Sequence, residues 1–457
     1  MTEAIKTKLS DSAAARWTAL TIVSVTMMFG YFFTDVMSPL EGMLATDLQW
    51  NGSEYGFFSG AYGLINVFLL MLFFGGIILD KMGIRFTCMF STITMLAGAV
   101  IKWYAVTFIP TETLVEWFHL HLIIINIDAP HLSNLVAALG FAIFGVGCEI
   151  AGITVSKIIA KWFTGHELAL AMGLQVALAR VGTMLAMWTS LPVAKHLGGV
   201  TTSIGLGAAL LCIGMIAFIY YCMMDRRLDE SDTTANVAAG EEEGFQFSDL
   251  GAIFSNPGFW VICLLCLMFY GGVFPFLKFA TKLMIVKYGV PDDLAGFIPG
   301  MLPMGTMFLT PLFGNIYDRK GHGVMLMILG SVLLTIVHAV FALPINAWWV
   351  AVLNMIVLGV AFSLVPSAMW PSVPKIIPMK QLGSAFAIIF FIQNIGLSLI
   401  PMGIGEVNRA NTQGDYTDYT MTMSIFAVFG VVSILLSLLL LSLEKTKHYG
   451  LEDSNIK

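Results

Sequence analysis

Charged residues are scarce in this chain. Asp, Glu, Lys and Arg together make up 11% of the 457 residues, whereas they make up about 25% of soluble globular domains. Hydrophobic residues reach 58%, above the roughly 45–50% of such domains. Length alone would suggest roughly three soluble domains, but repeated long apolar stretches override that expectation. The scarcity of charge excludes an ordinary soluble protein and favours one that lies in a membrane.

Other absences narrow the function. No block of Lys and Arg indicates nucleic-acid binding. No phosphate loop, nucleophile elbow or cluster of metal ligands is present, so we expect no enzyme, no cofactor and no metal. The six cysteines all lie in apolar stretches, where a thiol usually acts as a small hydrophobic group. The first apolar stretch is too long for a secretory signal. The sequence therefore shows none of the patterns typical of soluble enzymes or nucleic-acid-binding proteins.

Twelve windows of about 20 mainly apolar residues fill most of the sequence. They cover residues 18–40, 55–79, 86–108, 133–155, 167–190, 203–224, 257–280, 293–317, 323–343, 347–369, 381–403 and 420–443. A polar, acid-rich segment separates the two sets of six. We therefore predict an all-α integral membrane protein of twelve transmembrane helices in two six-helix bundles, residues 1–224 and 251–457, joined by a cytoplasmic linker, residues 225–250.

The distribution of Lys and Arg predicts the orientation. Cytoplasmic loops are enriched in these residues, and acidic residues contribute little. Most of the 23 Lys and Arg fall in segments that are cytoplasmic if both termini are inside. We therefore expect both termini in the cytoplasm.

A pattern of glycines around an acidic and a basic residue occurs once in each half. Its members are Gly76, Asp80, Lys81 and Gly83 in the first copy and Gly314, Asp318, Arg319 and Gly321 in the second. Glycine permits a tight turn, and the Asp can pair with a basic group and latch the cytoplasmic side in one state. Two copies at matching positions indicate an internal repeat. Here the sequence resembles the major facilitator superfamily, which implies two pseudo-symmetric bundles that work by alternating access.

Three ionisable residues inside the predicted spans are candidates for function, because charge within a membrane is costly. They are Asp35, Glu149 and Arg180. At 1.5 Å per residue, Glu149 and Arg180 lie roughly 18 and 20 Å from the inner boundary on neighbouring helices. We expect them near the membrane midplane. Asp35 could bind substrate or a proton, although it lies near the outer end, and Tyr31, just before it, is a further candidate for substrate binding.

Internal symmetry places neutral groups of the second half opposite these charges. Arg180 aligns with Asn394, and Glu149 aligns with Ser367, three residues before Trp370. A cavity with one anionic and one cationic end suits a zwitterion, whose amine meets Glu149 while its carboxylate pairs with Arg180. The alternative is a Glu149–Arg180 salt bridge that only neutralises charge in lipid.

Other polar groups receive structural interpretations. Lys278, Lys282 and Lys287 at the end of the seventh span are expected to extend to the outer interface. His119 and His121 would share one side of a strand, but no carboxylate cluster accompanies them in the sequence, so no metal site is predicted.

A closer resemblance is carried by residues 364–374, 381–387 and 392–396, which are similar to the lysosomal dipeptide transporters of the superfamily. This resemblance implies a uniporter that contacts the peptide termini with an acidic and a basic residue of the first half and an aromatic residue of the tenth helix. By position, these are Glu149, Arg180 and Trp370. The animal members work with an accessory subunit, which nothing in this sequence implies.

The expected function is therefore transport of dipeptides or related small zwitterions, with a lipid bilayer as the surroundings. The tail 1–16 has no acidic dileucine signal, so a bacterial cytoplasmic membrane is expected rather than a lysosome. The alternative is a proton-coupled carrier of organic anions, in which Arg180 binds a carboxylate and Glu149 or Asp35 carries the proton.

Overall fold

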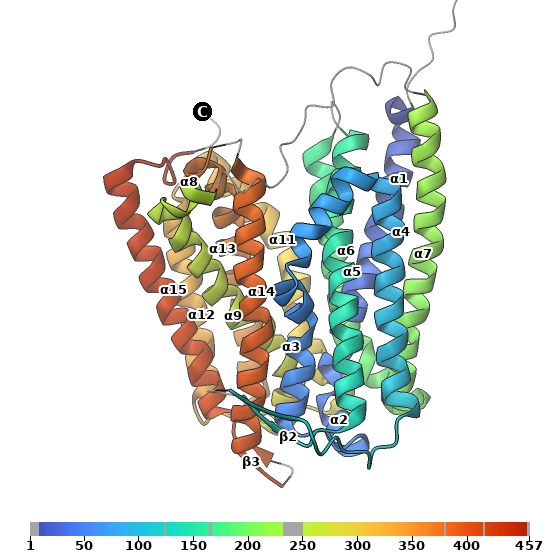
Figure 1. Cartoon of the computed structure of the whole chain (residues 1–457). Coiled ribbons are helices and arrows are strands. Elements are labelled where there is room, and N and C mark those ends of the chain that lie inside the picture. The colour runs from blue at the N-terminus through green and yellow to red at the C-terminus, as the bar shows by residue number, and fades with distance from the viewer. Residues whose placement is uncertain are drawn as a thin grey trace, which may run out of the picture.

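The chain folds into two bundles of long helices, as the computed structural model shows (Figure 1). The structure describes residues 9–122, 125–163, 167–231, 250–378, 381–414 and 416–454. Most of the predicted linker 225–250 lies outside the described residues, although α7 continues to Ser231. The division into two bundles and a linker by residue number stays a prediction.

The elements follow one another in the order of the predicted spans. The first half holds η1 (Leu9–Asp11), α1 (Ala13–Asp35), η2 (Ser38–Leu40), α2 (Glu41–Asp47), α3 (Gly52–Phe68), α4 (Met71–Phe108), α5 (Leu132–Phe163), α6 (Leu168–Leu197) and α7 (Val200–Ser231). The second half holds α8 (Leu250–Phe254), α9 (Pro257–Val286), α10 (Asp292–Ala295), α11 (Phe297–Lys320), α12 (Gly323–Ala342), α13 (Trp348–Ile376), α14 (Leu382–Ala410) and α15 (Thr420–Lys447). Two small antiparallel hairpins pair β1 (His119–Leu122) with β2 (Ile125–Asp128) and β3 (Thr412–Gln413) with β4 (Tyr416–Thr417).

Eleven helical segments among the described residues are long and apolar enough to cross a membrane. The second and third predicted spans are divided differently in the structure. The second is broken after α3, where Leu70 adopts a left-handed conformation, and it resumes as the first part of α4. Gly83 then interrupts α4 with φ 79° and ψ 170°, and the chain turns back there (Figure 1). Only glycine adopts such a conformation readily, so the boundary between these two spans is set by Gly83.

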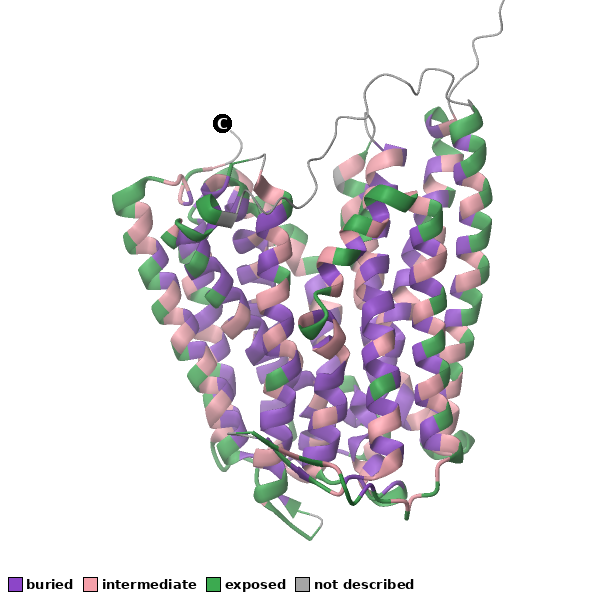
Figure 2. Cartoon of the chain, in the orientation of Figure 1, coloured by how far each residue is buried: buried purple, intermediate pink, exposed green. Residues whose placement is uncertain are grey.

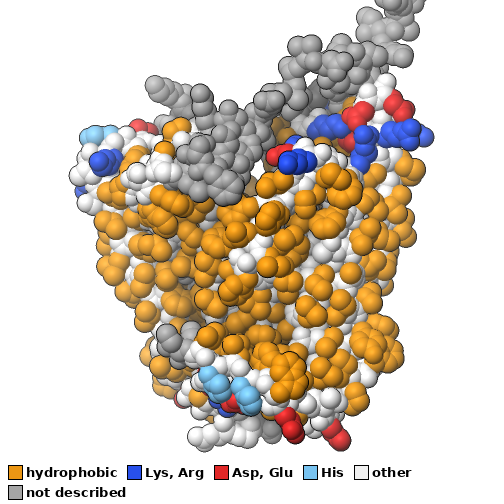
Figure 3. Space-filling model, in the orientation of Figure 1, with side chains coloured by type: hydrophobic (Ala, Val, Ile, Leu, Met, Phe, Trp, Pro, Cys, Tyr) orange, Lys and Arg blue, Asp and Glu red, His pale blue; other side chains and the backbone are white. Residues whose placement is uncertain are grey.

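The surface is apolar around the middle of the molecule. Many large hydrophobic side chains are exposed there, including Phe74, Ile216 and Leu435, and they form a broad band in Figure 3. Lys and Arg gather at one end of the face shown, together with some acidic and His side chains, and further His and acidic side chains lie at the other end. An exposed apolar band of this extent is unfavourable in water but favourable in the hydrocarbon core of a membrane. Figure 2 shows the buried residues inside and between the bundles.

The two halves meet along two helix pairs, α3 with α14 and α6 with α11. The approach of α3 to α14 is very close, because a Cβ on Gly56 would lie 2.5 Å from the carbonyl oxygen of Pro401 and 2.8 Å from the Cα of Gly405. A larger residue at either glycine would push the helices apart. The β1–β2 hairpin lies at one end of the molecule, opposite the start of α1 and the end of α15 (Figure 1). We call it the hairpin end.

Candidate functional site

Arg180 of α6 faces aromatic rings of the second half. Its guanidinium carbon lies 5.5 Å from the ring centroid of Phe274 on α9 and 5.6 Å from that of Phe362 on α13. These are cation–π distances. Among the described residues, no carboxylate lies within ion-pair distance of Arg180. The guanidinium therefore retains its hydrogen-bonding capacity for an anionic group.

The rings around Arg180 belong to a larger aromatic cluster that includes Trp370. The ring of Tyr270 on α9 lies 5.6 Å from that of Phe274 and 5.4 Å from that of Phe362. The indole N–H of Trp370, on α13, donates a 2.8 Å hydrogen bond to the hydroxyl of Tyr270. Arg180 and Trp370, both predicted from the sequence, thus contact one cluster from opposite halves. The rings of Phe274 and Phe362 were missed, since single phenylalanines in apolar spans give no sequence signal.

Glu149 of α5 has a single hydrogen-bond partner among the described residues. The hydroxyl of Tyr62, on α3, donates to its Oε1 over 2.9 Å. Helix α1 passes close to both charges beside Tyr31, because a Cβ on Gly30 would lie 3.7 Å from Sγ of Cys148 and a Cβ on Gly182 would lie 3.0 Å from the backbone nitrogen of Phe32. Glu149 and Arg180 do not form an ion pair. The salt bridge considered as the alternative is absent from this structure. Tyr62 was not among the residues predicted from the sequence.

Asn394 lies outside the aromatic cluster. It is 2% exposed and sits where α14 packs against Gly63 of α3. Its amide donates to the carbonyl of Phe390 over 3.0 Å, while its side-chain oxygen has no hydrogen-bond partner among the residues that the structure describes. The internal symmetry with Arg180 therefore matches in sequence position but not in surroundings, because α3 and α14 approach too closely to leave Asn394 accessible.

Asp35 forms an ion pair that joins the two halves. Lys278 of α9 lies 2.6 Å from its carboxylate, and both side chains are largely buried. One turn further along α9, Lys282 pairs with Glu41 of α2 over 3.2 Å. The expectation that these two lysines extend to the interface is wrong, because acidic partners from the first half hold them inside. Lys287 instead donates to the backbone carbonyls of Phe341 and Leu343. These contacts close the hairpin end beside a cavity of about 610 Å³.

Lys102 of α4 is a buried cation that the sequence argument overlooked. Its side chain is fully enclosed, and its ammonium donates to the carbonyl of Phe33 over 3.2 Å. The same nitrogen lies 3.9 Å from the ring centroid of Phe33 and 4.5 Å from that of Phe141. The rule that selected Asp35, a charge within an apolar span, would have selected Lys102 as well.

The two glycine-rich repeats form matching turns. Gly83 and Gly321 both have positive φ, 79° and 72°. In the first copy, Lys157 of α5 lies 2.6 Å from Asp80, and both side chains are about half exposed. Asp318 in the second copy also has an interaction partner. The turn geometry agrees with the pattern, whereas the latching role of these residues stays a prediction.

The fold is that of a membrane transporter built from two helical bundles. A match to the description "Major Facilitator Superfamily" covers residues 20–401, and the chain belongs to this family. It is accordingly a multi-pass membrane protein, and members of this family are transporters rather than enzymes.

Relatives of known name are similar over most of the chain. The lysosomal dipeptide transporter MFSD1 of Bos taurus is 26% identical over 391 residues, which cover 82% of this chain and 76% of the relative. The human protein of the same name is 26% identical over 398 residues, with the same coverage. Among solved structures, the nucleoside transporter NupG superposes with a TM-score of 0.69 at 16% identity, covering 93% of this chain and 99% of NupG. The resemblance to lysosomal dipeptide transporters and the fold expected from the sequence are thereby confirmed.

Proposed function

We propose that the chain moves dipeptides or related small zwitterions across a membrane as a uniporter. The observation that carries this proposal is that Glu149 and Arg180, opposite in sign and both near α1 beside Tyr31, do not neutralise each other. A zwitterion would supply both missing countercharges at once, its amine to Glu149 and its carboxylate to Arg180. The dipeptide transport named for the MFSD1 relatives supports this substrate class.

The proposed transport mechanism is alternating access. Helices α3 and α14, with the buried pairs of Lys278 and Lys282, hold the hairpin end closed. Between described residues, the ion pairs that join the two halves all lie at this end. The aromatic cluster of the second half would then move relative to Arg180 when the bundles rock. We further propose twelve spans, counting the two arms of α4 separately, with both termini in the cytoplasm of a bacterial cell.

Thermal stabilisation of the purified protein tests the proposal. A bound ligand stabilises a protein by about 2.7 kcal/mol at a hundred times its dissociation constant. We expect dipeptides to stabilise the wild type, and we expect N-acetylated and C-amidated dipeptides to do so much less. Arg180→Ala should abolish the effect, whereas Arg226→Ala, an exposed arginine of α7, should preserve it. Equal stabilisation of wild type and Arg180→Ala would contradict the proposal.

A second candidate is a proton-coupled carrier of organic anions. Arg180 without a carboxylate partner favours it, as does a 23% identity over 282 residues to a probable chloroplastic anion transporter of rice, covering 60% of this chain and 48% of that protein. Flux into proteoliposomes separates the two. A uniporter equalises the dipeptide concentrations with or without a pH gradient, whereas the carrier accumulates substrates that lack an amine and stops when an uncoupler is added.

A further inference from the structure

The β1–β2 hairpin brings two histidines and one aspartate together. In the antiparallel register His119 pairs with Asp128, and His121 pairs with Asn126. Side chains alternate along a strand, so residues two apart share a face with the residues directly opposite them. His119, His121 and Asp128 therefore project from one face of the hairpin. The sequence argument dismissed the two histidines because it found no carboxylate near them, and strand pairing supplies one.

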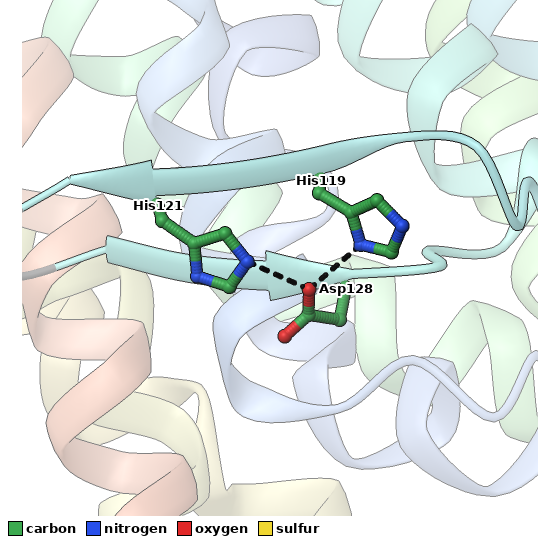
Figure 4. Close-up of side chains that lie close together, drawn as sticks. All are labelled: His119, His121 and Asp128. Carbon is green, nitrogen blue, oxygen red and sulfur yellow. Dashed lines mark hydrogen bonds and ion pairs between the residues drawn. The ribbon is translucent and has the colours of Figure 1, made fainter.

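Both imidazoles point at the same carboxylate oxygen (Figure 4). Nδ1 of His119 lies 2.8 Å and Nε2 of His121 lies 2.9 Å from Oδ1 of Asp128. The three potential ligand atoms all lie within 4.8 Å of one another. Zinc binds imidazole nitrogen at about 2.0–2.1 Å and carboxylate oxygen at about 2.0–2.2 Å, so shifts of side-chain rotamers alone suffice to place an ion among them.

The hydrogen bond to Asn126 orients the second imidazole as a ligand. Nδ1 of His121 lies 3.3 Å from the side-chain oxygen of Asn126, an acceptor to which it can donate a proton. In that tautomer the lone pair of Nε2 faces Asp128 and is available to a metal ion, whereas in the other tautomer Nε2 donates a hydrogen bond to Asp128. Ligating histidines usually donate their other ring nitrogen to a carbonyl or carboxylate in this way. Asn126 thus provides the outer support that a metal site requires.

We propose that His119, His121 and Asp128 bind a divalent transition-metal ion such as Zn²⁺. Two imidazoles and one carboxylate suit zinc and its first-row neighbours, whereas Ca²⁺ and Mg²⁺ require mainly oxygen ligands. Three protein ligands leave a fourth position for water. The site is independent of the proposed substrate, because its residues lie outside the membrane-spanning helices.

The bound ion would stabilise the β1–β2 hairpin, which contacts both halves of the molecule. The hairpin belongs to the first half, but Ile125 and Ile127 of β2 are buried in a cluster with Met402 of α14. The ligands come from both strands, so the ion would link β1 to β2 and hold β2 against the second half. Without the ion, the strand pairing would rest on a few hydrogen bonds, since an isolated two-stranded hairpin is only marginally stable. The expected consequence is a more rigid hairpin end.

Zinc titration of the untagged, full-length protein tests the site. The protein, first stripped of metal, competes for ZnCl₂ with a chromogenic chelator. We expect one Zn²⁺ per chain, and we expect His119→Ala and His121→Ala each to weaken binding by at least about tenfold, the lower end of what losing an outer-shell partner costs. His322→Ala is the matched control, because His322 is also exposed and pairs with one carboxylate, Glu452. CaCl₂ and MgCl₂ should not compete.

Hydrogen exchange provides the second readout. Zn²⁺ should slow amide exchange in both strands of the hairpin in the wild type and leave it unchanged in His121→Ala. The absence of a stoichiometric zinc site, or equal zinc affinity in the wild type and both histidine variants, would overturn the proposal. Neither measurement uses a transport substrate, so failure here leaves the proposed transport activity standing, and failure of dipeptide binding leaves this site standing.

Discussion

The two halves contact each other through different interactions at two levels along the helices. At the hairpin end, charge meets opposite charge: Asp35 and Glu41 of the first half pair with Lys278 and Lys282 of the second. Further along the helices, Arg180 meets aromatic rings rather than a carboxylate. Charge is at least partly buried at both levels, but among the described residues it is neutralised only at the hairpin end.

Under the proposed function, this difference would let one interface both hold the halves together and bind a substrate. A buried ion pair is costly to break by removing one partner, because the remaining charge stays buried and uncompensated. The buried ion pairs of the hairpin end therefore hold the two halves together. The unpaired level leaves Arg180 and Glu149 ready for charges brought by a substrate, which is the condition for a ligand to change the preferred arrangement of the two bundles.

The largest expected effect comes from breaking the buried ion pair of Asp35 and Lys278. Lys278→Ala leaves Asp35 buried without its cation, and we expect it to destabilise the protein by about 3–5 kcal/mol, measured as a lower midpoint of thermal unfolding. The double variant Asp35→Ala/Lys278→Ala should recover part of the loss. Lys195→Ala is the comparison, since its pair with Asp292 also joins the halves but is about one-third exposed. Equal losses for Lys278→Ala and Lys195→Ala would contradict the distinction.

A smaller effect is expected at the unpaired level from Arg180→Lys. Lysine keeps the charge but loses the planar fork that binds a carboxylate through two hydrogen bonds. A hydrogen bond to a charged group contributes about 1.5–3 kcal/mol, so dipeptide affinity should fall by roughly 10- to 150-fold. The dose dependence of thermal stabilisation measures it. An unchanged affinity would mean that another group holds the carboxylate.

Trp370→Phe tests the aromatic cluster that faces Arg180. It removes the hydrogen bond from the indole to Tyr270 and keeps an aromatic ring, so we expect dipeptide affinity to fall about two- to tenfold, the value of one neutral hydrogen bond. Tyr270→Phe removes the other partner of the same bond. The two single variants and the double variant should therefore be similar. Fully additive losses would indicate that the two residues act separately.

The smallest effect is expected at the two glycine-rich turns that contain Gly83 and Gly321. Asp80→Asn removes an exposed ion pair with Lys157, and exposed pairs contribute no more than about 1 kcal/mol. The unfolding midpoint should hardly change, whereas a latching role would appear as a changed rate of dipeptide flux. If Asp80→Asn leaves the flux unaltered, the turn is structural only. The equivalent variant of the second half, Asp318→Asn, shows whether both copies contribute.

The sequence predicted the fold, but it predicted only some of the side-chain contacts between the halves. Long apolar spans and two glycine-rich repeats need only periodicity and spacing, and these survive in the structure as long helices and as positive φ at Gly83 and Gly321. The lysines at the end of α9 were misjudged because their partners, Asp35 and Glu41, are more than 200 positions away. Asn394 matched Arg180 by symmetry, yet close packing with α3 encloses it.

By itself, the sequence determined that this chain is a two-bundle membrane protein, because the bilayer constrains helix length and composition along the chain. It also determined which spans carry Glu149 and Arg180. Only the tertiary structure decided how charges pair across the halves, that Arg180 faces Phe274 and Phe362, and that Asp128 lies beside His119 and His121. Such contacts depend on which helix faces and strand registers meet, and distance along the chain carries little information about that.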